Sequence, residues 1–204
     1  MSPTPGEPQP IRHEYEEHGI KGFYQQSGAD YRNPHEPQIR QSIHAAVRDW
    51  NLDLTHVLDL AAGSGEATLA LREAGATRID GIDPFTFEAY LDRTGQAAGR
   101  ESFEHIAAGA LAGRNYSLIV CSFALHLIEP SRIPQVAYQL STIGNELLIL
   151  TPHKRPQIRE EWGWTITQER VMRRVRSRLY RSLNGAANSA QYGPTIPASP
   201  QPGT

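Results

Sequence analysis

The chain has 204 residues, of which 39% are hydrophobic and 21% are charged, and its formal net charge is −2. This balance is typical of one globular domain, and a net charge so near zero argues against a protein that binds nucleic acid with its whole surface. No apolar run approaches the ~20 residues of a membrane span, and the first ten residues lack the apolar stretch of a secretory signal. The single cysteine, Cys121, excludes an intrachain disulfide framework and a cysteine-rich zinc site. We therefore expect a soluble, cytoplasmic protein.

Proline is concentrated at the two ends of the chain. Four of the fifteen prolines lie in residues 1–10 and four lie in residues 194–204. Segments of this composition bury too little apolar surface to offset the entropy of ordering them. We expect disorder over residues 1–10 and 186–204, with one domain over residues 11–185.

Between these ends, short apolar runs alternate with amphipathic stretches. The runs predicted as buried strands are Val57–Leu60, Ile79–Ile82, Phe103–Ile106, Leu118–Cys121 and Leu147–Leu150, and the predicted helices include residues 39–50, 67–74, 87–91 and 133–140. Alternation of strands and helices predicts an α/β domain with a mostly parallel sheet covered on both faces.

The stretch from Thr167 to Leu183 fits two patterns. Val171, Val175 and Leu179 are spaced by four, which favours a basic amphipathic helix. Apolar and arginine residues also alternate there, which suits a strand. Periodicity alone leans to the helix.

A small-residue loop follows the first predicted strand. Asp59 lies within that strand, and Ala61, Gly63 and Gly65 follow it before the next predicted helix. A glycine-rich turn at this place lets a ligand approach the backbone, and the first N–H groups of the helix favour an anionic group. Dinucleotides and S-adenosylmethionine are the two ligand classes bound in this way. The dinucleotide fingerprint fails, because Thr68 occupies the position of its third glycine.

The segment from Asp59 to Gly65, Asp-Leu-Ala-Ala-Gly-Ser-Gly, resembles the first motif of the class I (Rossmann-like) S-adenosylmethionine-dependent methyltransferases, D/E-x-G-x-G-x-G, with Ala61 in place of the first glycine. The resemblance covers about residues 36–183 and implies S-adenosylmethionine as the cofactor. It implies that Asp59 organises the loop near the methionine amino group. It also implies that Ala61, Gly63 and Gly65 line the methionyl moiety.

The same resemblance assigns the other cofactor contacts. Asp83, at the end of the second strand, would accept hydrogen bonds from both ribose hydroxyls, with Asp80 as the rival acid. Phe85 would pack on the adenine, and Ser122 would contact the cofactor after the fourth strand. After the third strand the family often has an acid that contacts the adenine amino group, whereas this chain has Ala107-Ala108-Gly109-Ala110.

The resemblance also implies a three-layer sandwich around a seven-stranded, mostly parallel sheet with one antiparallel strand. Trp164–Val171 and Val175–Tyr180 then become the last two strands, in place of the helix that periodicity favours.

The acceptor side carries two candidate acid–base groups. His126 follows the fourth strand and His153 follows the fifth, and for each of them a loop histidine that caps a carbonyl group is an equally good interpretation. Ser122-Phe123-Ala124 differs from the Asn/Asp-Pro-Pro-Tyr of amide and adenine methyltransferases, and no acidic pair for magnesium follows the fourth strand. By elimination we expect a small-molecule acceptor with an O, N or C nucleophile, and no metal.

Two further segments have alternative interpretations. Residues 11–50 are predicted to form lid or cap helices in which Tyr24, Tyr31 and His35 attract the sulfonium or bind the acceptor. A polar helix docked on the body is the equal alternative. The six arginines between Arg170 and Arg181 are interpreted as a solvated face rather than a nucleic-acid surface.

The function predicted from these residues is methyl transfer by in-line displacement, in which the protein mainly supplies alignment. The alternative is a non-catalytic partner or regulatory subunit with the same fold. A nicotinamide oxidoreductase is a third, weaker interpretation.

Overall fold

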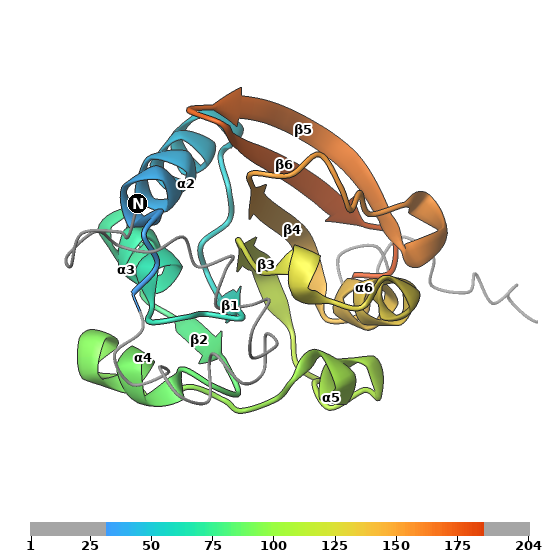
Figure 1. The fold of residues 1–204 in the computed structure, drawn as a ribbon. Coiled ribbons are helices and arrows are strands. Elements are labelled where there is room, and N and C mark those ends of the chain that lie inside the picture. The colour runs from blue at the N-terminus through green and yellow to red at the C-terminus, as the bar shows by residue number, and fades with distance from the viewer. Residues whose placement is uncertain (1–31, 186–204) are drawn as a thin grey trace, which may run out of the picture.

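The computed structural model describes residues 32–185. Tyr24, Tyr31, the two ends expected to be disordered and residues 11–31 of the expected lid lie outside the described residues. Six strands form one sheet in the order β2-β1-β3-β4-β6-β5 (Figure 1). The strands are β1 (Val57–Leu60), β2 (Ile79–Ile82), β3 (Tyr116–Ser122), β4 (Gly144–Thr151), β5 (Trp164–Met172) and β6 (Val175–Ser182).

The sheet has one antiparallel strand, as expected. β2, β1, β3 and β4 are parallel to one another, and β6 is antiparallel to both of its neighbours, β4 and β5. The helix favoured by periodicity over residues 167–183 is therefore wrong. β6 lies between two hydrogen-bonded strands, so pairing on both of its edges outweighs the local four-residue spacing of apolar side chains.

The predicted strand Phe103–Ile106 is also wrong, which is why the sheet has six strands instead of seven. These residues lie in helix α5 (Phe103–Ala107). The Ser102 hydroxyl accepts from the His105 backbone N–H, and the His105 ring accepts from the Ser102 N–H, which is a capping box that starts a helix. One isolated parallel bridge, between Ile82 and Gly99, is the pairing that β2 makes on this side.

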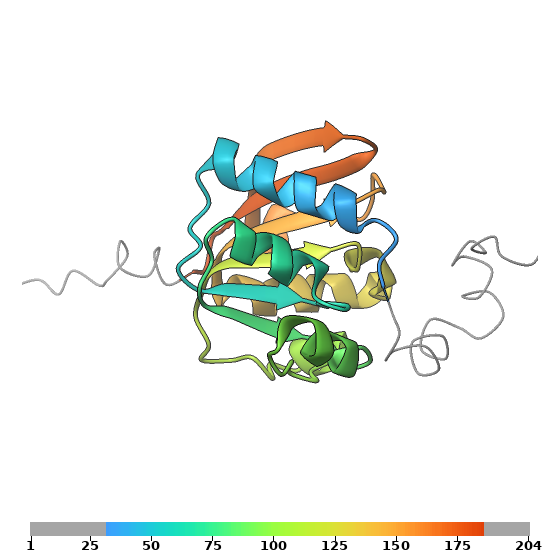
Figure 2. The same ribbon diagram turned by 90° about the vertical axis from the view of Figure 1, so that its left-hand side faces the viewer.

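Helices cover both faces of the sheet. α2 (Glu36–Trp50) and α3 (Glu66–Glu73) pack on one face, α5 and α6 (Ile133–Ser141) pack on the other, and α4 (Phe87–Thr94) lies beside β2 (Figures 1 and 2). Neighbouring strand residues alternate between the two cores: Val57 belongs to one and Leu58 to the other. This three-layer arrangement agrees with the expected one. The part of the expected lid that the structure describes includes α2, whose Ile39 and Ile43 are fully buried in the core.

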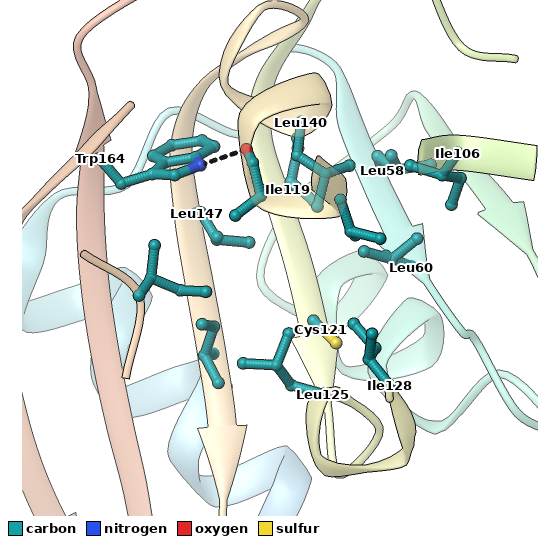
Figure 3. Packing of buried hydrophobic residues seen from close by; sticks show 14 of the residues in the cluster. Leu58, Leu60, Ile106, Ile119, Cys121, Leu125, Ile128, Leu140, Leu147 and Trp164 are labelled. Atoms are coloured by element: carbon teal, nitrogen blue, oxygen red, sulfur yellow. Dashed lines mark hydrogen bonds between the residues drawn. The ribbon is translucent and has the colours of Figure 1, made fainter. Parts of the chain in front are cut away.

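The core under α6 is closed by Trp164, whose indole N–H donates to the carbonyl of Ala137 at 2.8 Å (Figure 3). Cys121 lies in the same cluster and is fully buried. Burial raises the pKa of its thiol to about 12, so Cys121 is a small apolar core residue and not a nucleophile.

The parallel strands direct their following loops to one edge of the sheet. The loops after β1, β2, β3 and β4, the start of α2 and the β5–β6 turn all lie at this carboxyl edge, on the right of Figure 2. Ligands of open α/β sheets bind at such an edge. Among the described residues, no helix is both long and apolar enough to cross a membrane.

Candidate active site

The loop after β1 has a left-handed backbone at alternate residues. The φ angles are 55° at Ala61, 58° at Gly63 and 90° at Gly65. A Cβ atom on Gly65 would overlap the methyl group of Thr94, so this position requires glycine for space as well as for φ. Ala61, which replaces the motif's first glycine, holds a conformation that L residues disfavour. The loop thus keeps the backbone geometry of a glycine-rich turn despite the alanine.

Asp59 lies buried just before this loop. Its Oδ2 accepts from the Thr68 hydroxyl at 2.7 Å, and that hydroxyl is 3.0 Å from the hydroxyl of Tyr90. Its Oδ1 is buried and has no hydrogen-bond partner among residues 32–185. Burial raises the pKa of Asp59 to about 7. An orphaned carboxylate oxygen in this place suits a ligand that brings an N–H donor.

Asp83 joins the first two loops. Its Oδ1 accepts from the backbone N–H groups of Phe85 and Thr86, each at 2.9 Å, and its Oδ2 accepts from the Gly63 N–H at 3.1 Å. The Thr86 hydroxyl in turn donates to the Gly63 carbonyl at 2.8 Å. An ionised carboxylate has about four acceptor positions, so about one stays available for a ligand hydroxyl.

The rival acid, Asp80, lies away from this edge. It is the second residue of β2, and its Oδ2 accepts from the Tyr116 hydroxyl at 3.0 Å and lies 3.1 Å from the His56 ring nitrogen. Asp83 is thus the acid that follows β2 at the carboxyl edge.

Glu66, which is buried, and Arg93, which is partly buried, form a connection that the sequence did not predict. The Glu66 Oε1 accepts from the Ser64 hydroxyl at 2.5 Å, the Asn33 N–H at 2.9 Å and Arg93 Nη1 at 3.2 Å. Arg93 also pairs with Glu36, the first residue of α2. The glycine loop is therefore tied to α4 and to the segment before α2. An acid in the first turn after the loop was the only sequence signal for it.

The two predicted acid–base histidines lie in contact with each other. Their ring centroids are 4.8 Å apart at an interplanar angle of 61°. His126 lies in the short turn Leu125–Leu127 after β3, and His153 follows β4. Burial, and then the neighbouring His153, lower the pKa of His126 below its ordinary value. A neutral imidazole at neutral pH is a proton acceptor.

Phe123 and His35 lie in contact with each other at the same carboxyl edge of the sheet. Their rings stack with centroids 5.0 Å apart, and Phe123 has a φ of 54° directly after Ser122, the last residue of β3. A left-handed conformation is strained for a large side chain, and such strain is concentrated at functional sites. The Phe123 N–H donates to the Leu150 carbonyl at 2.8 Å, which holds the turn against β4.

Arg178 is 1% exposed and holds the loop that carries His153. It donates to the carbonyls of Lys154 at 2.9 Å and Pro156 at 3.4 Å, and its Nε lies 3.1 Å from a Glu169 carboxylate oxygen. The run from Arg170 to Arg181 is therefore only partly the solvated face expected from the sequence. A strand that pairs on both edges can turn an arginine inward when carbonyl groups and a carboxylate receive it.

The predicted site residues thus form two groups at one edge. Around the ends of β1 and β2 lie Asp59, Ala61, Gly63, Gly65, Asp83 and Phe85, and around the ends of β3 and β4 lie Ser122, His126 and His153, with His35 before α2.

Solved structures define the class of fold. The magnesium protoporphyrin IX methyltransferase of Synechocystis, crystallised with bound S-adenosylmethionine (SAM), is 18% identical with a TM-score of 0.52, and the match covers 83% of this chain and 93% of that one. An O-methyltransferase family protein from Burkholderia thailandensis is 14% identical with a TM-score of 0.58, over 85% of this chain and 62% of that one. Mitomycin 7-O-methyltransferase is 13% identical with a TM-score of 0.58, over 84% of this chain and 59% of that one. The chain has the class I methyltransferase fold.

A relative that the match covers over most of its length shows the family. The "Uncharacterized protein C17A5.05c" of Schizosaccharomyces pombe is 31% identical over 221 aligned positions, which cover 81% of this chain and 90% of the yeast protein. The chain belongs to the same family as this yeast protein. No protein-family model matches the chain.

Proposed function

We propose that the protein is an S-adenosylmethionine-dependent methyltransferase that acts on a small-molecule acceptor. The observation that carries the proposal is the left-handed glycine loop bonded to Asp83 at the ends of β1 and β2. The fold of this class and the orphaned Oδ1 of Asp59 support the same cofactor.

The residues present fit this cofactor. Asp59 would receive the amino group of the methionyl moiety, the loop from Ala61 to Gly65 would lie along that moiety, and Asp83 would accept from a ribose hydroxyl. Phe85 and Ser122 would complete the contacts on the adenine side and at β3. When bound, S-adenosylmethionine supplies a methyl group on a sulfonium, which is transferred in line to a nucleophile.

The acceptor's proton would pass to the histidine pair. The lowered pKa of His126 favours its neutral form, which would accept the proton of an O–H or N–H nucleophile as that nucleophile attacks the methyl group. The ring of His153 lies against that of His126, with the two centroids 4.8 Å apart. Alignment of the nucleophile with the methyl group supplies most of the remaining rate.

A methyl-transfer assay tests this proposal. The protein is incubated with methyl-labelled S-adenosylmethionine and a small-molecule extract, and label in the extract is measured. Replacement of the proton acceptor in His126→Phe should lower the rate about 10²–10⁴-fold for a protic nucleophile. His44→Gln, on the face of α2 that meets α3, is the control and should leave the rate unchanged. The wild-type rate should rise with pH through a pKa below the ordinary histidine value.

A non-catalytic partner of the same fold is the second candidate. It is favoured by Ala61 in place of glycine and by helix α5 and residues 107–110 where an acid toward the adenine is expected. Cofactor binding without any label transfer would support this second function.

A further inference from the structure

Four exposed cations lie on the acceptor side of the carboxyl edge. Lys154 and Arg155 follow β4, and Arg173 and Arg174 form the turn between β5 and β6. None of the four forms an ion pair within the described part of the chain, whereas the nearby Arg170, Arg176 and Arg178 each pair with a carboxylate. We call these four residues the cationic cluster. No carboxylate of residues 32–185 neutralises its positive charge.

The register of the sheet brings the cluster together. Thr151, the last residue of β4, is opposite Arg176, and Met172 pairs with Val175 across the turn. The turn and residues 152–155 therefore leave the sheet at the same end (Figure 2). Arg178 fixes the loop by binding the Lys154 carbonyl, so Lys154 stays beside β6. His153 is its neighbour in the chain, which places the cluster beside the histidine pair.

The turn holds its two arginines at a conformational cost. Arg173 has a φ of 48° and Arg174 has a φ of 67°, so both residues of this two-residue hairpin loop have a left-handed backbone. Hairpins of this kind strongly favour Asn-Gly, and arginine is among the residues that disfavour this conformation. Two adjacent arginines in a backbone conformation that disfavours them indicate that their positive charge serves a function.

We propose that the methyl acceptor is anionic and that the cationic cluster binds its carboxylate or phosphate group. The inference rests on the proposed function, because it is the acceptor of that reaction that the cluster would hold. Arginine and lysine side chains together bind such groups through charge-assisted hydrogen bonds. An anion held beside Lys154 brings the rest of a small molecule to His153 and His126.

The test uses a variant that removes charge and relieves the turn. In the double variant Arg173→Asn, Arg174→Gly the hairpin receives its favoured residues, so its melting temperature should be equal to or above that of the wild type. Pyrophosphate and citrate are the phosphate and carboxylate probes, titrated at low salt with S-adenosylhomocysteine (SAH) present and followed by the ring resonances of His153 and His126. At least one probe should bind the wild type, and the variant should bind it five- to tenfold more weakly.

Two further variants and one further probe complete the design. The double variant Lys154→Gln, Arg155→Gln should weaken the binding of the same probe to a similar degree. Arg78 is an exposed arginine before β2, and the control variant Arg78→Gln should leave this binding unchanged. Equal binding by the wild type and both double variants would overturn the inference. So would binding of a single-stranded RNA without binding of either small anion.

Binding of S-adenosylhomocysteine is measured on the same samples, so that the two proposals fail separately. Its binding with no response to either anion would overturn the anionic acceptor and leave the proposed function standing. Anion binding without S-adenosylhomocysteine binding would overturn the proposed function.

Discussion

Gly65 is the residue whose replacement separates backbone strain from lack of space. Its φ is 90°, and an added Cβ atom would meet the Thr94 methyl group. Gly95 has a φ of 70° but no atom within 4 Å of an added Cβ. We expect Gly95→Ala to lower the free energy of unfolding by about 1–2 kcal/mol, the usual cost of a left-handed L residue.

Gly65→Ala should cost more, about 2–4 kcal/mol, because overpacking adds to the same backbone cost. Urea unfolding of both variants measures the difference. Equal losses of unfolding free energy in the two variants would mean that the loop has room for a methyl group at position 65 and that Thr94 moves aside without cost.

Asp59 should make stability depend on pH. Its pKa is raised in the folded state from 3.8 to about 7, so the folded protein binds a proton there that the unfolded chain has lost. Its contribution is then fully present below pH 3.8 and is lost as the pH rises to about 7. A shift of this size corresponds to about 4 kcal/mol at most.

Asp59→Asn removes this titration. Between pH 5 and pH 8, a range that includes the raised pKa of about 7, the free energy of unfolding of Asp59→Asn should rise relative to that of the wild type. Thr68→Val removes only the hydroxyl that donates to Asp59, so the free energy of unfolding of this variant should still depend on pH. Parallel curves for the wild type and Asp59→Asn would show that Asp59 is ionised throughout.

At the scale of elements, the loop after β4 depends on β6. Arg178 donates to two carbonyl groups of that loop and pairs with Glu169. Arg178→Met leaves those carbonyls unpaired, and we expect the free energy of unfolding to fall by about 1.5–3 kcal/mol, the usual range for hydrogen bonds to a charged group. Hydrogen exchange should become faster over residues 152–157 and stay unchanged in β1 and β3.

Arg132→Met is the matched control for this change. Arg132 forms an exposed pair with Glu129 at 3.6 Å, and such pairs contribute little. A loss for Arg178→Met no larger than for Arg132→Met would contradict the role given to Arg178.

Element prediction succeeded where local pattern and sheet topology agree. Val57–Leu60 and Leu147–Leu150 read as buried strands, and they pair in the parallel sheet with both faces covered. It failed at Phe103, where the capping box formed by Ser102 and His105 outweighs the apolar run. Periodicity also failed in β6, because its pairing partners are distant in the chain.

At the scale of the whole molecule, the sequence predicts which loops meet but not what joins them. Parallel strands bring Asp83, His126 and His153 to one edge whatever the loops contain. The contact between Glu66 and Arg93 spans 27 positions and depends on how α3 and α4 pack, so no local pattern contains it. For the same reason, the contact of the two histidine rings could not be predicted from their separate positions.

The central claim is that the edge formed by the glycine loop and Asp83 binds S-adenosylmethionine. Calorimetric titration with its product, S-adenosylhomocysteine, tests it most directly on the wild type, Asp83→Ala and Asp80→Ala, with circular dichroism to confirm folding. We expect the wild type and Asp80→Ala to bind and Asp83→Ala to bind at least tenfold more weakly. Absence of wild-type binding at ~1 mM, where the free energy is weaker than about −4 kcal/mol, or a loss caused by Asp80→Ala and not by Asp83→Ala, would contradict the claim.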